Sequence, residues 1–259
     1  MYPVIFNLPD WFPLLGGEAI TSFGVFMLFA FLTGGYVIRA GMRRIGEDPD
    51  KAWDLVFMGV IGGIAGAKLY YILLNYERLT TDPGALILSR GGLVWYGGFL
   101  LATALVVWEI RRQKMSLPKM ADIIAPALAL AYAVGRMGCF LVGDDYGKAT
   151  DLPWAVAFPQ GAPPTPPGIE VHPTQLYEVM WLLPVAGLLW LRRKKSPFVF
   201  GEYLVANGAG RIVIEHWRVN PEVALGLTEP QWIGIALIVA GVGGWLYYLR
   251  RQRAHEATA

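Results

Sequence analysis

The chain has few of the residues that build disulfides and metal centres. Among its 259 residues there is one cysteine, Cys139, and there are three scattered histidines. A single cysteine excludes an intramolecular disulfide and any cysteine-based metal cluster. We therefore expect neither a metal site nor a cofactor.

Charge is also scarce. Charged residues make up 16% of the chain and hydrophobic residues 55%, with 10 tryptophans and a mean hydropathy of +0.42. A soluble domain of this size would carry more charge and shorter apolar runs. The net charge of +2 comes with no basic face interleaved with aromatics, so we expect no nucleic-acid partner. The composition indicates a membrane protein.

Seven apolar stretches are each long enough to cross a hydrocarbon core of about 30 Å. They predict an all-α polytopic membrane protein with seven transmembrane helices in a single membrane domain, residues 1–259. The stretches are 19–38, 53–75, 92–110, 121–142, 175–191, 200–217 and 230–249.

Basic residues gather beside alternate ends of these stretches and predict the orientation. Under the positive-inside rule these clusters are cytoplasmic, which places the N-terminus outside and the C-terminus in the cytoplasm. This pattern requires an odd number of spans, in agreement with seven. The clusters hold 15 of the 22 Lys and Arg: Arg39, Arg43, Arg44, Lys51, Arg111, Arg112, Lys114, Lys119, Arg192, Arg193, Lys194, Lys195, Arg250, Arg251 and Arg253.

The longest stretch between predicted spans, residues 143–174, is rich in proline and glycine and contains Trp154 and Phe158. A loop this long in a compact protein is usually a lid, a binding loop or a linker. Its Trp-Ala-Val-Ala-Phe centre suggests a short strand or a segment that dips into the interface. We therefore expect a small, ordered extracytoplasmic head.

Three cations fall within predicted spans, in the halves nearer the outer face: Lys68, Arg136 and Arg211. An ionisable group at membrane depth costs about 3 kcal/mol on insertion scales and marks a candidate functional site. Cations that open toward one leaflet suit a lipid phosphate, which an arginine can bind through two parallel hydrogen bonds. The alternative is that they pair with carboxylates and staple the helices together. The candidate partners are Glu178, Glu202, Asp144 and Glu215.

Glu215 lies four residues after Arg211, so the two share a helix face, and Arg218 follows three residues later. Arg211 and Glu215 could neutralise each other as a structural pair. Alternatively, Glu215 could hold Arg211 in position for a phosphate. The sequence leaves both open.

Several ordered motifs resemble those of the prolipoprotein diacylglyceryl transferases, over nearly the whole chain. The motifs are Gly66-Ala-Lys-Leu-Tyr-Tyr, Gly91-Gly92 with Gly97-Gly98, Ala121-Asp-Ile-Ile-Ala-Pro126, Gly135 to Gly147, His172-Pro-Thr-Gln-Leu-Tyr-Glu178, Arg211 to Arg218 and the span containing Gln231. The resemblance implies a multi-pass enzyme of the bacterial inner membrane. Such an enzyme transfers the diacylglyceryl group of phosphatidylglycerol to the lipobox cysteine thiol behind a preprolipoprotein signal peptide, and releases glycerol phosphate.

The resemblance also implies roles for individual residues. Arg136 and Arg211 match the two most important arginines of the family and would stabilise the departing phosphate ester. Tyr96 is the third catalytic candidate. The substrate-binding candidates are Lys68, Gly97, Gly98, Asp144, Gly147, Glu215 and Arg218.

The chain departs from the family pattern within the signature itself. Cys139 and Val142 stand where the family usually has asparagine, and Asp144 stands in place of glutamate. Tyr96 replaces a histidine that is a candidate for deprotonating the thiol, so the general base stays open, with His172 as a substitute. Cys139 is expected to be a packing residue. The substitution at Tyr96 keeps open a phospholipid-binding protein, or a transferase with another acceptor.

Overall fold

The computed structural model describes residues 2–9, 11, 17, 19–79, 81–88 and 92–258, and is mostly helical. Each predicted span corresponds to a helix. The helices are α1 (Ser22–Ile45), α2 (Lys51–Leu74), α4 (Trp95–Arg112), α5 (Leu117–Val142), α6 (Thr174–Arg192), α7 (Val199–Glu215) and α8 (Glu229–Thr258). The 3-10 helix η1 (Tyr76–Leu79) and the six-residue α3 (Pro83–Leu88) connect α2 to α4. The helical class is confirmed.

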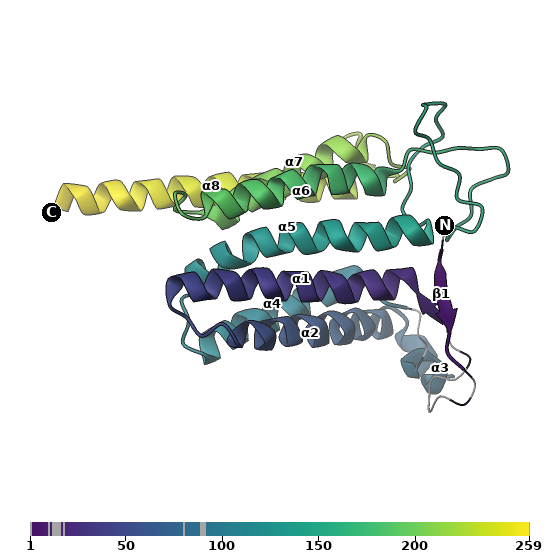
Figure 1. Ribbon diagram of the computed structural model, residues 1–259, viewed down its shortest axis with the longest axis horizontal. Helices are drawn as coiled ribbons and strands as arrows, with labels where there is room; N and C mark the ends of the chain where they lie inside the picture. The colour runs from purple at the N-terminus through teal and green to yellow at the C-terminus, as the bar shows by residue number, and fades with distance from the viewer. Residues whose placement is uncertain are drawn as a thin grey trace. The chain divides into compact units, whose positions relative to one another are not determined.

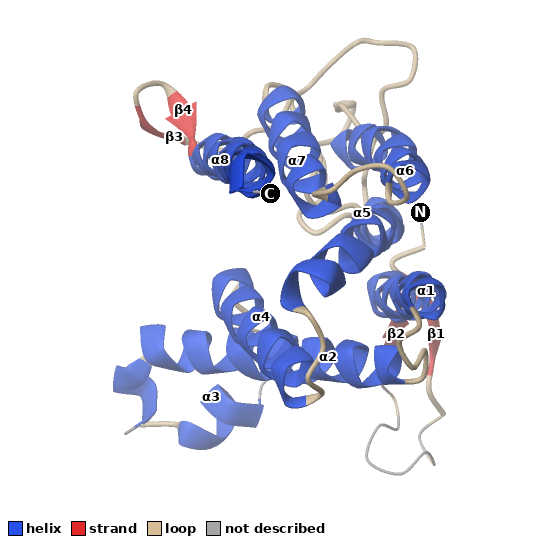
Figure 2. Cartoon of the chain, turned by 90° about the vertical axis from the view of Figure 1, so that its left-hand side faces the viewer, coloured by secondary structure: helices blue, strands red, loops and turns tan. Residues whose placement is uncertain are grey.

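Two small antiparallel hairpins were not expected. Strand β1 (Val4–Asn7) pairs with β2 (Ala19–Thr21) before α1, and β3 (Glu222–Ala224) pairs with β4 (Leu227–Thr228). The second hairpin joins α7 to α8, as Figure 2 shows. Strands of two to four residues are too short to leave a periodic pattern in the sequence.

Within the described residues, five helices are long and apolar enough to cross a membrane: α1, α2, α5, α6 and α8. The multi-pass membrane character is therefore confirmed. The other two predicted spans, α4 and α7, have 18 and 17 residues. The count of seven spans and the orientation of the termini stay predictions.

The chain forms two compact units, and the boundaries between them fall within α1 and within α5 (Leu117–Val142). The smaller unit, Gly35–Ala121, is built on α2 against α4. An added Cβ at Gly97 would lie 2.3 Å from the carbonyl oxygen of Gly66, and one at Gly66 would lie 2.3 Å from that of Gly97. Only glycine allows two backbones to approach this closely, as small residues do between membrane helices.

The larger unit contains the first part of α1 and everything from Asp122 onward. In it α6, α7 and α8 run side by side (Figure 1). Glycines again bring two helices together, because a Cβ at Gly208 of α7 would lie 2.4 Å from the carbonyl oxygen of Gly234 in α8. An apolar cluster joins α5, α6 and α7: Ala125, Ala129, Ala186, Leu189, Val199 and Tyr203.

The loop between α5 and α6 is ordered around Phe158. This side chain is fully buried, stacks on Tyr146 with ring centroids 5.4 Å apart and meets Phe140 edge to face. The expected strand is reduced to one isolated bridge between Val156 and Val171. The loop returns the chain to the end of the unit where α5 stops, so the first turns of α6 lie beside the last turns of α5.

Candidate active site

The larger unit brings together arginines from three segments. Arg136 lies near the end of α5, Arg211 near the end of α7, and Arg218 just after α7. Glu178 faces them from the second turn of α6. Because α6 and α7 are antiparallel neighbours, the beginning of one and the end of the other meet at the same end of the bundle.

Glu178 is the centre of this network. Its carboxylate pairs with Arg136, lies 3.0 Å (Oε1) from Nη1 of Arg211 and lies 3.6 Å from Nη1 of Arg218. The Tyr132 hydroxyl, one turn before Arg136, donates to the same oxygen at 3.3 Å and accepts from Arg211 at 3.2 Å. The Glu178 side chain is 4% exposed. Three guanidinium groups therefore share one buried carboxylate.

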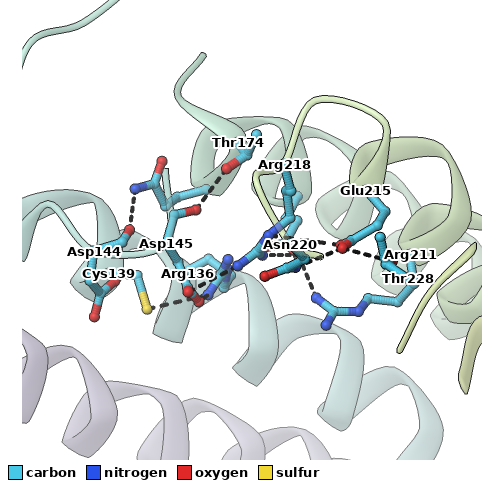
Figure 3. A network of polar contacts seen from close by, with 12 residues as sticks. Arg136, Cys139, Asp144, Asp145, Thr174, Arg211, Glu215, Arg218, Asn220 and Thr228 are labelled. Carbon is cyan, nitrogen blue, oxygen red and sulfur yellow. Dashed lines mark hydrogen bonds and ion pairs between the residues drawn. The ribbon is translucent and has the colours of Figure 1, made fainter. Parts of the chain in front are cut away.

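Asp145 makes a second bridge. Its Oδ2 accepts from Nη1 of Arg136 at 3.0 Å, and its Oδ1 lies 2.9 Å from Nη2 of Arg218 (Figure 3). Asp145 has a positive φ of 58°, and its carbonyl oxygen accepts from the Thr174 hydroxyl at 2.8 Å. Burial alone would raise the pKa of the Asp145 carboxyl, but the charges of Arg218 and Arg136 outweigh it and lower that pKa.

Glu215 forms an ion pair with Arg218, not with Arg211. It lies 3.8 Å from Nε of Arg218 and accepts hydrogen bonds from Asn220 at 2.6 Å and Thr228 at 2.9 Å (Figure 3). Arg211 pairs with Glu178 instead. Arg136 and Arg211 thus pair with Glu178, as the stapling alternative allowed. Glu215 pairs with Arg218, so the direct Arg211 to Glu215 pair that the helix spacing suggested is not formed.

The other two candidate partners do not contact these arginines. Glu202 pairs with Arg192 at the opposite end of α7. Asp144 lies beside Cys139, and its carbonyl oxygen accepts from Gln175. Burial raises the pKa of the Asp144 carboxyl, against a hydrogen bond from the Cys139 thiol that lowers it. Nη1 of Arg136 also points at the Cys139 sulfur, 3.4 Å away.

The paired arginines still have donors to spare. Nη2 of Arg136 is buried and has no hydrogen-bond partner within the described part of the chain. Buried N–H groups are nearly always paired, so this one marks a place for a further acceptor. Arg211 is 26% exposed and lines a small pocket with Tyr132 of α5 and with residues of α6 and α7 that include Trp181 and Asn207. A buried N–H of Arg136 and the exposed part of Arg211 are therefore available to a further hydrogen-bond acceptor.

Four predicted site residues belong to the smaller unit. Lys68 lies over the ring of Tyr71, 5.4 Å from its centroid, and Tyr96 packs edge to face on Trp95. Gly97 and Gly98 are buried against α2, and a Cβ at Gly98 would lie 2.7 Å from the carbonyl oxygen of Gly63. Close helix packing accounts for both glycines. Substrate roles for these four residues stay predictions.

Gly147 and His172 lie in the loop beside the network. Gly147 donates to the carbonyl oxygen of His172 at 2.9 Å, and a Cβ on it would lie 2.4 Å from the carbonyl oxygen of Trp217. The His172 ring is buried, and its Nδ1 lies 3.0 Å from the Tyr177 hydroxyl. Burial, helped by the charge of Lys148, lowers the pKa of His172.

Reasoning from sequence missed three aspects of this region. The Thr174 hydroxyl bonds the Asp145 carbonyl oxygen, and no side-chain hydrogen bond caps α6. Tyr132 could have been found, since it lies four residues before Arg136 on the same helix face. Asp145 left no signal beyond its position next to Asp144.

The family model described as "Prolipoprotein diacylglyceryl transferase" matches residues 9–247. A phosphatidylglycerol–prolipoprotein diacylglyceryl transferase of Clostridium tetani is 32% identical over 246 residues, covering 93% of this chain and 96% of its own. Relatives of the same name from Photobacterium profundum and Synechococcus elongatus are each 32% identical, over 95% and 92% of this chain and 94% and 87% of theirs.

Proposed function

We propose a function from one premise: this chain belongs to the prolipoprotein diacylglyceryl transferase family. It transfers the diacylglyceryl group of phosphatidylglycerol to the lipobox cysteine of a preprolipoprotein and releases glycerol phosphate. The observation that carries the proposal is the buried network of Arg136, Arg211 and Arg218, which has an N–H of Arg136 left to donate.

In this reaction the substrate thiolate attacks the glycerol carbon that is bonded to the phosphate oxygen. The C–S bond forms, the C–O bond breaks, and the electron pair leaves with the phosphate ester. Negative charge therefore builds on the departing group. Cations positioned where this charge develops stabilise the transition state more than the ground state.

We assign this role to Arg136 and Arg211, with Arg218 as a further phosphate ligand. Glu178 acts as a positioning residue, because it fixes all three guanidinium groups before the lipid arrives. Glu215 positions Arg218 through its own bonds to Asn220 and Thr228. Asp144, Gly147, Lys68, Gly97 and Gly98 complete the proposed substrate-binding set.

The base that takes the thiol proton is proposed to be Tyr96 or His172. Burial and the charge of Lys148 lower the pKa of His172 and so weaken it as a proton acceptor, whereas an ordinary tyrosine has a pKa near 10 and needs cations to deprotonate it at neutral pH. Transfer rates of Tyr96→Phe, Tyr96→His and His172→Gln separate the two. The residue whose loss removes the acidic limb of the pH–rate profile, where protonation of the base slows transfer, is the base.

We further propose seven spans with the N-terminus outside, and a location in the bacterial inner membrane. The basic clusters at alternate helix ends support this orientation. It places the arginine network and the head of residues 143–174 on the outer side. That is the side on which a lipobox cysteine emerges after its signal peptide.

The test is transfer by the purified protein in micelles that contain phosphatidylglycerol. We expect a synthetic lipobox peptide to gain one diacylglyceryl thioether for each glycerol phosphate released. The same peptide with its cysteine changed to serine serves as the control. Folded protein that binds the lipid but transfers nothing would contradict the assignment. That result would favour a phospholipid-binding role, the alternative that remains because Tyr96 replaces the family histidine.

A further inference from the structure

The three carboxylates of the arginine network differ in exposure. The side chains of Glu178 and Glu215 are 4% and 1% exposed, whereas that of Asp145 is 52% exposed. Separating a half-exposed carboxylate from its arginines costs little free energy, because water already solvates it. Separating a buried carboxylate costs several kcal/mol, because it leaves buried charges unpaired. Asp145 is therefore the member of this set that can leave its arginines.

The charges of the network balance before any lipid is bound. Three guanidinium groups contact three carboxylates, those of Glu178, Glu215 and Asp145. A phosphodiester would add one negative charge to this balanced set. Departure of one carboxylate as the phosphate enters keeps the balance and returns one charge to water.

The geometry of Asp145 matches that of the group it would exchange with. Its two oxygens each contact a different arginine, Oδ2 at 3.0 Å from Arg136 and Oδ1 at 2.9 Å from Arg218. The two non-bridging oxygens of a phosphodiester can make the same pair of contacts. Asp144, the next residue back, contacts neither arginine through its side chain and cannot play this part.

We propose that Asp145 is a displaceable counterion that occupies the phosphate position between Arg136 and Arg218 until phosphatidylglycerol enters. The inference rests on the proposed function, since it takes the phosphate of that substrate as the incoming anion. The Thr174 hydroxyl holds the Asp145 backbone, so the exchange needs only a rotation of the side chain. The return of Asp145 also competes with glycerol phosphate and helps it to leave.

The substitution that isolates this charge is Asp145→Asn. The residue has a positive φ of 58°, a conformation that asparagine tolerates as well as aspartate does. Asp145→Gly tolerates the same backbone and removes the side chain, so it serves as a second variant. Asp151→Asn removes one negative charge from an exposed position in the same loop and is the matched control.

The measurement is binding of dihexanoyl phosphatidylglycerol, a short-chain probe, to each purified protein by calorimetry. We expect both Asp145 variants to bind it roughly threefold to tenfold more tightly than the unsubstituted chain does, the effect of removing a half-exposed competing charge. Asp151→Asn should bind as the unsubstituted chain does. Inhibition of transfer by glycerol phosphate should strengthen by the same factor in Asp145→Asn.

Equal or weaker binding by both Asp145 variants would overturn the inference, because a carboxylate that only positions the arginines weakens phosphate binding when it is lost. The outcome is separable from that of the proposed function. Tighter binding by the variants with no transfer by the unsubstituted chain would uphold the counterion and refute the transferase. Active transfer with unchanged binding would do the reverse.

Discussion

The two ends of the α6 and α7 pair carry the same kinds of side chain in different arrangements. At one end Arg192 and Glu202 form a closed two-bond pair, both bonds at 2.7 Å, with Arg192 56% exposed. At the other end Glu178 is shared by three arginines, and Arg136 is only 8% exposed. In the exposed pair, the two side chains use their hydrogen-bonding groups on each other. In the buried network, three arginines share one carboxylate, so some of their N–H donors stay available to a ligand.

The largest effect is expected from breaking the shared carboxylate. Glu178→Ala leaves three guanidinium groups without their common partner, and breaking a buried pair in this way costs about 3 to 5 kcal/mol. Thermal and denaturant unfolding in micelles should show this loss, together with loss of transfer. Glu202→Ala is the matched control on the same helix pair and should cost about 1 kcal/mol or less. Equal losses would show that burial and sharing do not distinguish the two ends.

A smaller effect is expected at the neighbouring residues Asp144 and Asp145, whose contributions to stability should depend on pH with opposite signs. Arg218 and Arg136 lower the pKa of Asp145 against the effect of burial, so its contribution to stability is present above its unfolded pKa of about 3.9 and is lost as the pH falls through its folded pKa. Asp145→Asn should therefore be less stable than the unsubstituted chain at neutral pH, and the difference should shrink in acid.

Asp144 should behave in the opposite way. Burial raises its pKa, so the stability it contributes is full below the unfolded pKa and is lost as the pH rises through the folded one. Asp144→Asn should match the unsubstituted chain in acid and exceed it in unfolding temperature at neutral pH. Unfolding temperatures of both variants between pH 3 and 8, values chosen to span the unfolded pKa near 3.9, provide the measurement. Parallel profiles would show that the arginines do not distinguish Asp145 from Asp144.

The smallest effect is expected at the closed pair. A double-mutant cycle with Arg192→Ala and Glu202→Ala should give a coupling free energy of about 0.5 kcal/mol, since one partner is largely in water. The corresponding cycle with Arg211→Ala and Glu178→Ala should give several times more. Transfer should be unaffected by Arg192→Ala, and a loss of activity there would place part of the site at the wrong end of α7.

The sequence was informative where one property repeats over many residues. Long apolar runs predicted every long helix, but not the end of α8, which continues to Thr258 through a charged segment. Arg136 and Arg211 were predicted as site residues because a cation at membrane depth is costly. The partners were harder to find, because Asp145 and Thr174 are 29 residues apart and meet only through the loop between α5 and α6. Such pairing depends on the path of the backbone, which no local pattern encodes.

We propose that the shared, buried arginine network performs the chemistry, and the pair of Arg192 and Glu202 at the other end is its comparison. The measurement is diacylglyceryl transfer by folded Arg136→Lys and Arg192→Lys, which make the same conservative change at the two ends. Lysine lacks the planar fork of arginine, so we expect Arg136→Lys to lose about 100-fold or more and Arg192→Lys to keep its rate within about twofold. Equal rates in the two variants would contradict the account.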